Sequence, residues 1–434
     1  MRARAAYYYH QLSESFWFLP SLIALAAILL SAGTLALDRN PPTLLYEVLP
    51  WSEGLDRSNA RLIISTVSGS IITAASLVFS LTLVALTLAA SQLGPRLLSM
   101  FMRDRITQVV LGTFVGTFVF ALLILANLGD SSGGLEVPRA SIFMALLLTL
   151  VSFALLIVFI HHLSSSLNAE TVVARLAHNL DLQLSGLLRE RDETAEHESD
   201  AKVAWDSSGS VVSTQCGYLQ AVDSKALVEI ACEQETEILL HWRAGHFVQK
   251  GEVIADLRQK PDDFDDVAGR IRACMVFGPQ RTDAEDPEYA FRAVVEIALR
   301  ALSPGINDPY TALTCTDWLG QGLRQILAGR LPDRIRRDDS GKPRLHTNPL
   351  TVGGFFDAAF NDLRQSAEGN VPVLIRVAET LARLDEVAKE PEARDAVLHH
   401  SNLIARACKR SVAEEEDRED MDDRLKEIGI RLSG

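Results

Sequence analysis

Residues 142–160 read IFMALLLTLVSFALLIVFI, without a charged side chain. A helix needs about 20 apolar residues to cross a bilayer, so this run predicts a transmembrane helix. A few residues later the character of the chain changes. Beyond about residue 165 the sequence is charged and typical of a water-soluble domain. This boundary divides the chain into a membrane half and a soluble half.

Three further apolar segments precede the quoted run. We predict transmembrane helices at about 16–37, 61–91, 107–128 and 140–162, which form a domain of residues 1–165 in the lipid bilayer. The interior of each segment lacks Lys, Arg, Asp and Glu. The first segment is too long for a secretory signal peptide and has no cleavage pattern. Core helices of a soluble protein imitate one such segment, but hardly four in succession.

Arginines predict the orientation, because Lys and Arg concentrate on the cytoplasmic side of a membrane. Arg2 and Arg4 precede the first span, and Arg96, Arg103 and Arg105 lie in the short loop after the second. The N-terminus is therefore expected inside, and after four crossings the soluble half is cytoplasmic too. All five cysteines lie in that half, widely spaced and without Cys-x-x-Cys, which suits reduced thiols.

The second predicted span carries a stripe of hydroxyl side chains on one helical face. The stripe consists of Thr66, Ser70, Thr73, Ser76, Ser80, Thr87 and Ser91. Small hydroxyl residues let membrane helices pack closely, and they also suit the wall of a water-filled path in an oligomer. We expect no charge deep in any span, which argues against a charge-coupled transporter but not against a passive pore.

Two other features of the membrane half are open to interpretation. Gly112 and Gly116 form a Gly-x-x-x-Gly pair on the third span and predict a helix contact. His161 and His162 follow the fourth span directly. We interpret them as interfacial polar residues, with a pH-sensitive gate as the alternative.

The net charge of −14 resides in the soluble half. Through residue 162 the chain has 9 Arg, no Lys and 8 acidic residues, whereas the remainder has 33 basic and 48 acidic residues. An acidic domain repels nucleic acid and anionic lipid, so we expect no nucleic-acid partner. The same charge would concentrate cations near a pore.

The soluble half has three predicted parts. Residues 166–208 form an exit helix, continuous with the fourth span, and then an acidic linker. Residues 209–258 form a small β-rich unit, and residues 262–434 show helical spacing to the end. The predicted fold class is therefore a membrane α-helical domain with a cytoplasmic α+β domain that is mostly helical.

Residues 245–254 resemble the Gly-x-x-Val-x-Lys-Gly hairpin of biotinyl and lipoyl carrier domains. A carrier lysine needs a hairpin tip, whereas Asp223 or Ser224 is a good helix N-cap and places Lys225 at the start of a short helix. We therefore expect no lipoylation and no cofactor.

The sharpest break in the helical part lies at residues 300–309. Ser303 and Pro304 end one helix, and after Asn307 the next helix begins with Asp308 as its cap and Pro309 at its first position. This predicts a tight helical hairpin. It is a candidate subunit contact or ligand-binding elbow, with ordinary helix punctuation as the alternative.

Enzyme motifs are missing from the sequence: it has no Gly-x-Ser-x-Gly, no phosphate-binding loop and no His-Glu-x-x-His. His399 and His400 lie in a predicted helix, where adjacent side chains diverge by about 100° and share a metal poorly. The acidic run 414–423 lacks the glycine turn of a calcium loop. We expect neither an enzyme nor a metal site.

Three stretches, residues 90–96, 217–223 and 300–312, resemble a bacterial membrane-protein family that is filed only as a domain of unknown function (family twenty-two fifty-four). The third contains Ala-Leu-Ser-Pro-Gly-Ile-Asn-Asp-Pro and is the most specific. Leu93 and Gly94 depart from the family's usual aromatic residue and Ser. The resemblance implies an inner-membrane location and this domain order, and it supplies no reaction.

Two functions remain. The first is an oligomeric inner-membrane channel or pore-like transport protein, permeable to cations and gated or assembled by its cytoplasmic domain. The alternative is a membrane-anchored scaffold or sensor without transport activity.

Overall fold

The computed structural model describes residues 16–39, 55–92, 104–128, 137–166, 168–188, 205–282 and 285–426. The chain divides into two compact units, Met1–Thr171 and Val172–Gly434. Four of the arginines used to predict the orientation, at positions 2, 4, 96 and 103, lie outside the described residues. Most of the predicted acidic linker does so as well.

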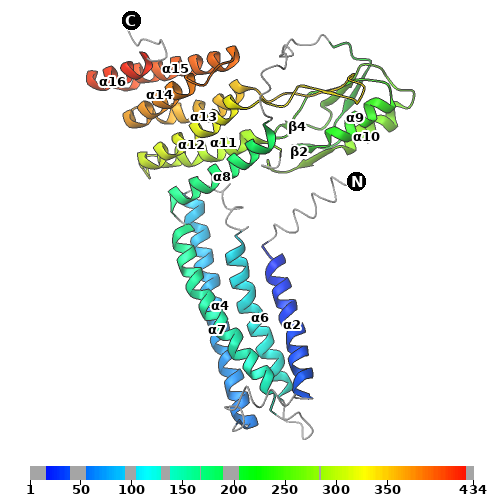
Figure 1. The fold of residues 1–434 in the computed structure, drawn as a ribbon, viewed down its shortest axis with the longest axis vertical. Coiled ribbons are helices and arrows are strands. Elements are labelled where there is room, and N and C mark those ends of the chain that lie inside the picture. Colours follow the sequence, from blue (N-terminus) through cyan, green and yellow to red (C-terminus); the bar gives the residue numbers. More distant parts are fainter. Residues whose placement is uncertain are drawn as a thin grey trace. The chain divides into compact units, whose positions relative to one another are not determined.

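The described part of the first unit contains four long helices, each long and apolar enough to cross a membrane (Figure 1). They are α2 (Phe18–Arg39), α4 (Arg57–Gln92), α6 (Arg105–Asn127) and α7 (Arg139–Ser166). The 36 residues of α4 rise by roughly 54 Å at 1.5 Å per residue. Because the hydrocarbon core is only about 30 Å thick, α4 must tilt or extend beyond it.

Helix α6 packs against the other three helices and supplies much of their common core. Large apolar side chains fill the interior of the bundle, among them Phe114, Phe120, Ile124, Ile64, Ile71, Ile142 and Phe159. Gly112 and Gly116 lie where α6 meets α2: a Cβ on Gly112 would come within 2.8 Å of Ile23 Cδ1 and 2.9 Å of Pro20 Cα. The glycines therefore allow these two backbones to approach closely.

Polar links join the ends and the middle of the bundle. Asp38, at the end of α2, accepts hydrogen bonds from the backbone N–H of Ala140 (2.8 Å) and Ser141 (3.0 Å) and from the Ser141 hydroxyl (2.6 Å). It thus occupies the N-terminus of α7, where free N–H groups and the helix dipole favour an anion. Between α6 and α7 the hydroxyls of Thr117 and Ser152 lie 3.2 Å apart.

The prediction that the exit helix continues directly from the fourth span is wrong. Helix α7 ends at Ser166 and α8 (Ala169–Leu187) starts afresh, with the Asn168 side chain accepting a hydrogen bond from the Glu170 N–H (2.9 Å). Asn favours helix starts for this reason, and the local apolar pattern did not reveal the break.

The β-rich part of the second unit contains two sheets. One has the strand order β1-β5-β3-β8-β7 and the other β4-β2-β6; all pairs are antiparallel except β3 with β8. The strands are β1 (Gly209–Val212), β2 (Gly217–Val222), β3 (Ile238–Leu240), β4 (Phe247–Val248), β5 (Val253–Leu257), β6 (Met275–Gly278), β7 (Ile335–Arg337) and β8 (Pro343–His346). Helices α9 (Ser224–Glu233) and α10 (Phe264–Ala273) accompany them.

Two predictions for this part have different outcomes. Asp223 accepts a hydrogen bond from the Ala226 N–H (3.1 Å) and caps α9, so Lys225 stands in the first turn of a helix and not at a hairpin tip. In contrast, the β-rich part was predicted to end at residue 258, but β6, β7 and β8 come from the part that was predicted to be helical. These strands have three or four residues, too few for a local period to mark them. β6 and β8 also pair with strands far away in sequence, whereas β7 pairs with β8.

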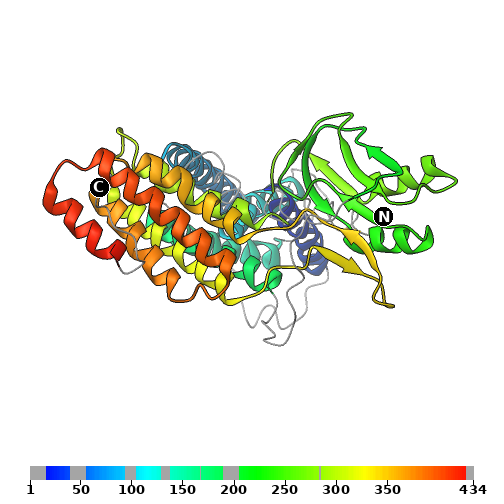
Figure 2. The same ribbon diagram turned by 90° about the horizontal axis from the view of Figure 1, so that it is seen from above.

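The remainder of the second unit is a series of stacked helices (Figures 1 and 2). They are α11 (Pro287–Ala301), α12 (Pro309–Ala328), α13 (Val352–Ser366), α14 (Val371–Asp385), α15 (Pro391–Ser411) and α16 (Glu415–Lys426). Helix α11 packs on α12 and α13, α12 on α14, α13 on α15 and α14 on α16. Consecutive helical hairpins therefore stack on one another, as in repeat-type helical folds. The predicted fold class of four apolar helices followed by a mostly helical unit with a small β-rich part is confirmed.

Candidate functional site

The hydroxyl stripe of α4 points away from the core of its own bundle. All seven residues of this α4 hydroxyl face (Thr66, Ser70, Thr73, Ser76, Ser80, Thr87 and Ser91) are exposed in the single chain. The core-facing residues of α4 lie on the opposite side of the helix: Ala60, Ile64, Val67, Ile71, Ala75, Val78, Ala85 and Ala89. Packing within one chain therefore does not account for the stripe.

Most hydroxyls of this face donate to carbonyls of their own helix. Thr66 donates to Leu62 O (2.7 Å) and Ser76 to Ile72 O (2.9 Å), and Ser70, Thr73, Thr87 and Ser91 make similar bonds. Each of these hydroxyls uses its hydrogen in the bond to the carbonyl, and its oxygen lone pairs remain able to accept from outside the helix. The face can thus accept hydrogen bonds from water or contact a cation without leaving a donor unsatisfied.

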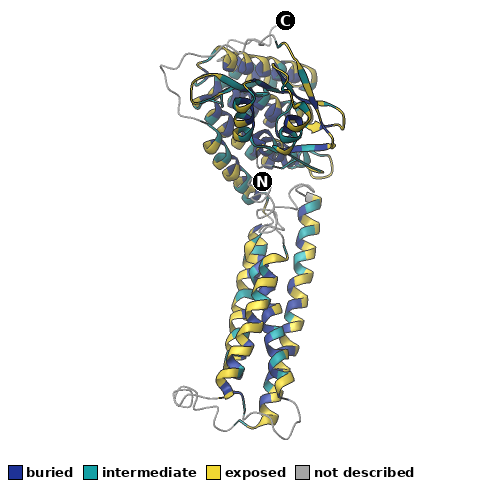
Figure 3. Ribbon diagram, turned by 90° about the vertical axis from the view of Figure 1, so that its right-hand side faces the viewer, coloured by how far each residue is buried: buried dark blue, intermediate teal, exposed yellow. Residues whose placement is uncertain are grey.

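All four helices of the bundle expose residues along their length (Figure 3), but the exposed residues of the other helices are largely apolar. On α7, Leu150 is 68% and Ile157 72% exposed, and α2 presents leucines in the same way, as lipid contact requires. The α4 hydroxyl face is mixed, because exposed apolar residues such as Leu62 and Leu77 lie among the hydroxyls.

A polar cluster lies at one end of the bundle. His162 Nε2 lies 2.8 Å from Asp104 Oδ2, and the same carboxylate caps α6 by accepting hydrogen bonds from the N–H (3.2 Å) and hydroxyl (2.6 Å) of Thr107. The Ser166 hydroxyl lies 3.3 Å from the same histidine nitrogen. His162 thus ties α7 to the start of α6, whereas His161 is exposed.

The predicted hairpin between α11 and α12 forms an exposed corner. Asp308 accepts hydrogen bonds from the N–H (3.2 Å) and hydroxyl (2.6 Å) of Thr311 and caps α12, with Pro309 as the first helical residue. Asn307 has a left-handed φ of 51° and donates its N–H to Ser303 O (2.9 Å). These features are those of a helix end followed by a helix start. They explain the predicted residues Ser303, Pro304, Asn307, Asp308 and Pro309 by the turn between α11 and α12. Beside them, Ile306 and Tyr310 present apolar side chains to solvent.

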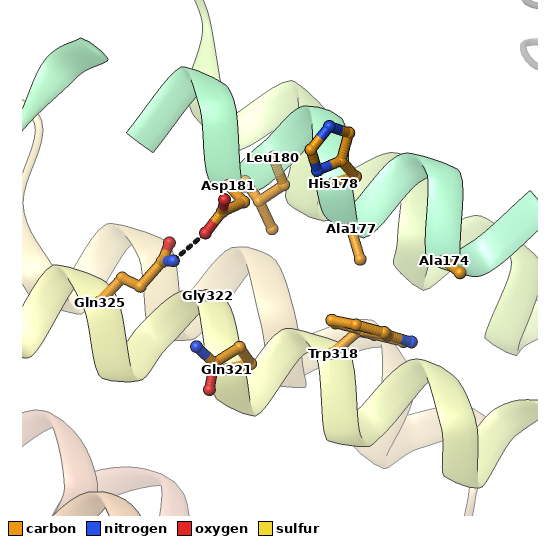
Figure 4. Close-up of a pocket in the computed structure, with 9 residues that line it drawn as sticks. All are labelled: Ala174, Ala177, His178, Leu180, Asp181, Trp318, Gln321, Gly322 and Gln325. Atoms are coloured by element: carbon orange, nitrogen blue, oxygen red, sulfur yellow. Dashed lines mark hydrogen bonds between the residues drawn. The ribbon is translucent and has the colours of Figure 1, made fainter. Parts of the chain in front are cut away.

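The second unit also holds a cavity of about 270 Å³ between α8 and α12 (Figure 4). It is lined by Ala174, Ala177, His178, Leu180, Asp181, Trp318, Gln321, Gly322 and Gln325. Gly322 allows the close approach of the helices, since a Cβ there would lie 2.9 Å from Leu180 Cδ2 and 2.9 Å from Phe291 Cζ.

The chemistry of this cavity is mixed. Gln325 donates a hydrogen bond to the Asp181 carboxylate at one side, and the half-exposed indole of Trp318 forms another wall. Apolar walls with a few polar groups are typical of small-molecule sites. Sequence reasoning missed this cavity because its two walls are about 140 residues apart and neither carries a motif.

A buried ion-pair network joins the β-rich part to the start of α11. Arg243 pairs with Glu288, and Arg281 pairs with Asp286, which caps α11 by accepting from the Tyr289 N–H (3.2 Å). Burial raises the pKa of Asp286, and the Arg281 guanidinium opposes that rise. Each described charge in the network has an opposite partner, so we interpret it as structural.

Comparisons with known proteins agree with this architecture. Uncharacterized protein Mb1321c of Mycobacterium bovis and Uncharacterized protein Rv1290c of Mycobacterium tuberculosis are each 31% identical to the chain over 367 residues, which is 83% of this chain and 70% of the relative. No solved structure matches the chain significantly. A model of predicted membrane proteins matches residues 13–383. The chain therefore belongs to this family of predicted membrane proteins of unknown function, DUF2254.

Proposed function

We propose that the protein is an oligomeric pore of the bacterial inner membrane, permeable to cations, in which the α4 hydroxyl faces of several chains line a path between subunits. The main support for this proposal is that the α4 hydroxyl face is exposed on the outside of the single bundle, opposite the core-facing side of α4. Hydroxyl oxygens at this position stay hydrated more readily than the leucines on α7.

The packing of one bundle supports a path between chains. Its interior is filled by Phe114, Phe120 and other large apolar side chains, which would exclude a hydrated ion. In an oligomer, the outward hydroxyls would instead face one another across a shared axis. The exposed leucines beside them would contact the neighbouring subunit.

The charge distribution supports cations as the permeant species. Beyond residue 162 the chain carries 33 basic and 48 acidic residues, and in our proposal this acidic unit lies in the cytoplasm, where it would raise the local cation concentration. The stacked helical hairpins would assemble or gate the pore. The proposal includes no catalytic reaction.

The test is ion flux through the reconstituted full chain. Liposomes loaded with KCl should release K⁺ when they contain the wild-type protein, and a KCl gradient should give a reversal potential of the cation-selective sign. The double variant Ser76→Leu/Ser80→Leu should reduce release to the level of empty liposomes, because it adds apolar bulk to the path. Ser76→Ala/Ser80→Ala keeps the side chains small and should retain part of the flux.

A matched control lies on α7. Leu150→Ala/Ile157→Ala changes two outward side chains on a lipid-facing helix and should leave the flux unchanged. Absence of flux from the wild-type protein, or equal flux from the wild-type protein and the leucine variant, contradicts the proposal.

The cavity between α8 and α12 favours a second candidate function, a membrane-anchored sensor without transport activity. In this reading the four helices hold a ligand-binding unit at the membrane. Folded protein that gives no flux, but shows saturable quenching of Trp318 fluorescence by a small molecule, would favour the sensor. Loss of that quenching in the Trp318→Leu variant would assign the signal to this cavity.

A further inference from the structure

Three potential metal ligands meet where α13 packs on α15. Asp357 belongs to α13, and His399 and His400 are consecutive residues of α15. One ligand atom from each residue can be chosen so that all three lie within 4.8 Å of one another. His400 Nε2 lies 3.3 Å from Asp357 Oδ1. We propose that Asp357, His399 and His400 form a binding site for a transition-metal dication of the Zn²⁺ type.

The spacing suits such an ion. With metal–ligand distances of about 2.1 Å and tetrahedral angles, two ligand atoms on one zinc ion lie roughly 3.4 Å apart. The Asp357–His400 pair already has this separation. The remaining adjustment is of the order of an ångström, and it falls on Asp357 and His399, whose side chains are exposed. Asp357 Oδ1 also accepts a hydrogen bond from the Asn361 side-chain amide (2.8 Å), which metal binding would have to share or replace.

The two histidines alone would share a metal ion poorly, because they are adjacent on one helix. Adjacent positions on α15 do diverge, and the two rings lie 5.2 Å apart, nearly perpendicular. However, Asp357 approaches from the neighbouring helix, so that its carboxylate lies within reach of both histidines. The third ligand comes from tertiary packing, which the helical wheel of α15 does not contain.

His400 provides a preorganised ligand. Its side chain is 2% exposed and lies against the rings of Phe356 and Phe360, each with its centroid 5.9 Å away. Its Nδ1 is buried and finds no hydrogen-bond partner among the described residues, and the contact of Nε2 with Asp357 is long for a hydrogen bond. A buried imidazole bonded so weakly is an exception among buried polar groups. With its proton on Nδ1, the neutral ring presents the lone pair of Nε2 to a metal ion.

The surrounding charges decide which ion binds and how tightly. Burial lowers the pKa of His400 to about 4, so its ring is neutral and able to bind metal at pH 7. Two nitrogen ligands favour zinc-like ions over Mg²⁺ and Ca²⁺, which prefer oxygen. The charge of Arg364 also acts on His400 and opposes a dication. Three protein ligands leave coordination positions open to water, so we expect exchangeable binding.

The experiment uses tag-free full chain in detergent, stripped with a chelator and titrated with ZnCl₂ in a calorimeter. The Co²⁺ form provides a second readout through its visible absorption. One equivalent of Zn²⁺ should bind to the wild-type protein. His399→Ala and Asp357→Asn should each weaken this binding by about tenfold or more, as losses in a metal site commonly do. His400 is left intact because its side chain is buried, so that truncation to alanine would open a cavity beside Phe356 and Phe360.

The matched control is His241→Ala. His241 also pairs with a carboxylate, Asp256, at 2.8 Å, but it belongs to no such cluster among the described residues, so this variant should bind Zn²⁺ as the wild-type protein does. Equal thermal unfolding of all variants without metal shows that each is folded. The site is refuted if the wild-type protein does not bind stoichiometrically, or if His399→Ala and Asp357→Asn both bind as tightly as wild type.

Discussion

The contact of α6 with α2 gives a quantitative prediction at Gly112. A Cβ at this position would lie 2.8 Å from Ile23 Cδ1 and 2.9 Å from Pro20 Cα. Carbon atoms prefer about 3.5–4.0 Å, so Gly112→Ala must push the two helices apart. Ile23 can rotate its terminal carbon away, but Pro20 Cα belongs to the backbone and cannot.

The expected magnitude combines two opposing effects. Overpacking of a core contact costs about 1–3 kcal/mol. Alanine in place of glycine in a helix interior stabilises by about 1 kcal/mol. We therefore expect Gly112→Ala to lower the free energy of unfolding by up to about 2 kcal/mol. Gly116→Ala should cost less, because its Cβ would meet Ala27 Cβ at 3.3 Å.

The control is Gly33→Ala on α2, where a new Cβ meets nothing within 4 Å among the described residues. This variant keeps the favourable helix effect without the clash and should be as stable as wild type or more so. Unfolding by sodium dodecyl sulfate in mixed micelles, followed by circular dichroism, measures the order of the variants. If Gly112→Ala proves as stable as Gly33→Ala, the close approach of α2 and α6 is wrong.

Three further predictions concern single polar residues. Asp38→Ala should lower the stability of the first unit by about 2 kcal/mol in the same micelle assay, because the start of α7 loses three hydrogen bonds; an unchanged midpoint would contradict this role. Asp308→Ala should cost about 1 kcal/mol in thermal unfolding, because it removes the cap of α12 at Thr311, and Asp308→Asn should restore most of it. His400, whose pKa burial lowers from 6.5 to about 4, binds its proton more readily in the unfolded chain. Stability that is complete above pH 6.5 should therefore fall by up to about 3 kcal/mol as the pH drops towards 4, and His400→Phe should flatten this slope.

The sequence was sufficient where a local pattern determines the structure. Four uncharged apolar segments predict four helices because only a helix satisfies its own backbone hydrogen bonds in lipid. The caps at Asp223 and Asp308 were predictable because they are local: each carboxylate accepts a hydrogen bond from an N–H only three residues further along the chain. The short strands β6, β7 and β8 were not, because three or four residues show no local period, and β6 and β8 also pair with strands distant in sequence.

The candidate sites were likewise predictable only where they depend on local sequence. The seven hydroxyls of α4 could be placed on one helical face from their spacing, but their direction depends on which side α6 and α7 cover. The role of Asp38 was missed, because an aspartate after an apolar run is typical of a loop and the amides it binds begin at Ala140. The meeting of Asp357 with two histidines some forty residues away also required the fold.

The central claim is that the α4 hydroxyl face lies between subunits of one assembly, and native mass spectrometry of the full chain released from detergent tests it most directly. Because the interior of a single bundle is filled by side chains such as Phe114 and Phe120, a pore requires several chains. The account predicts one discrete oligomer in the wild-type protein and its loss or change in Ser76→Leu/Ser80→Leu. A wild-type protein that is monomeric under conditions that preserve its fold would contradict the account.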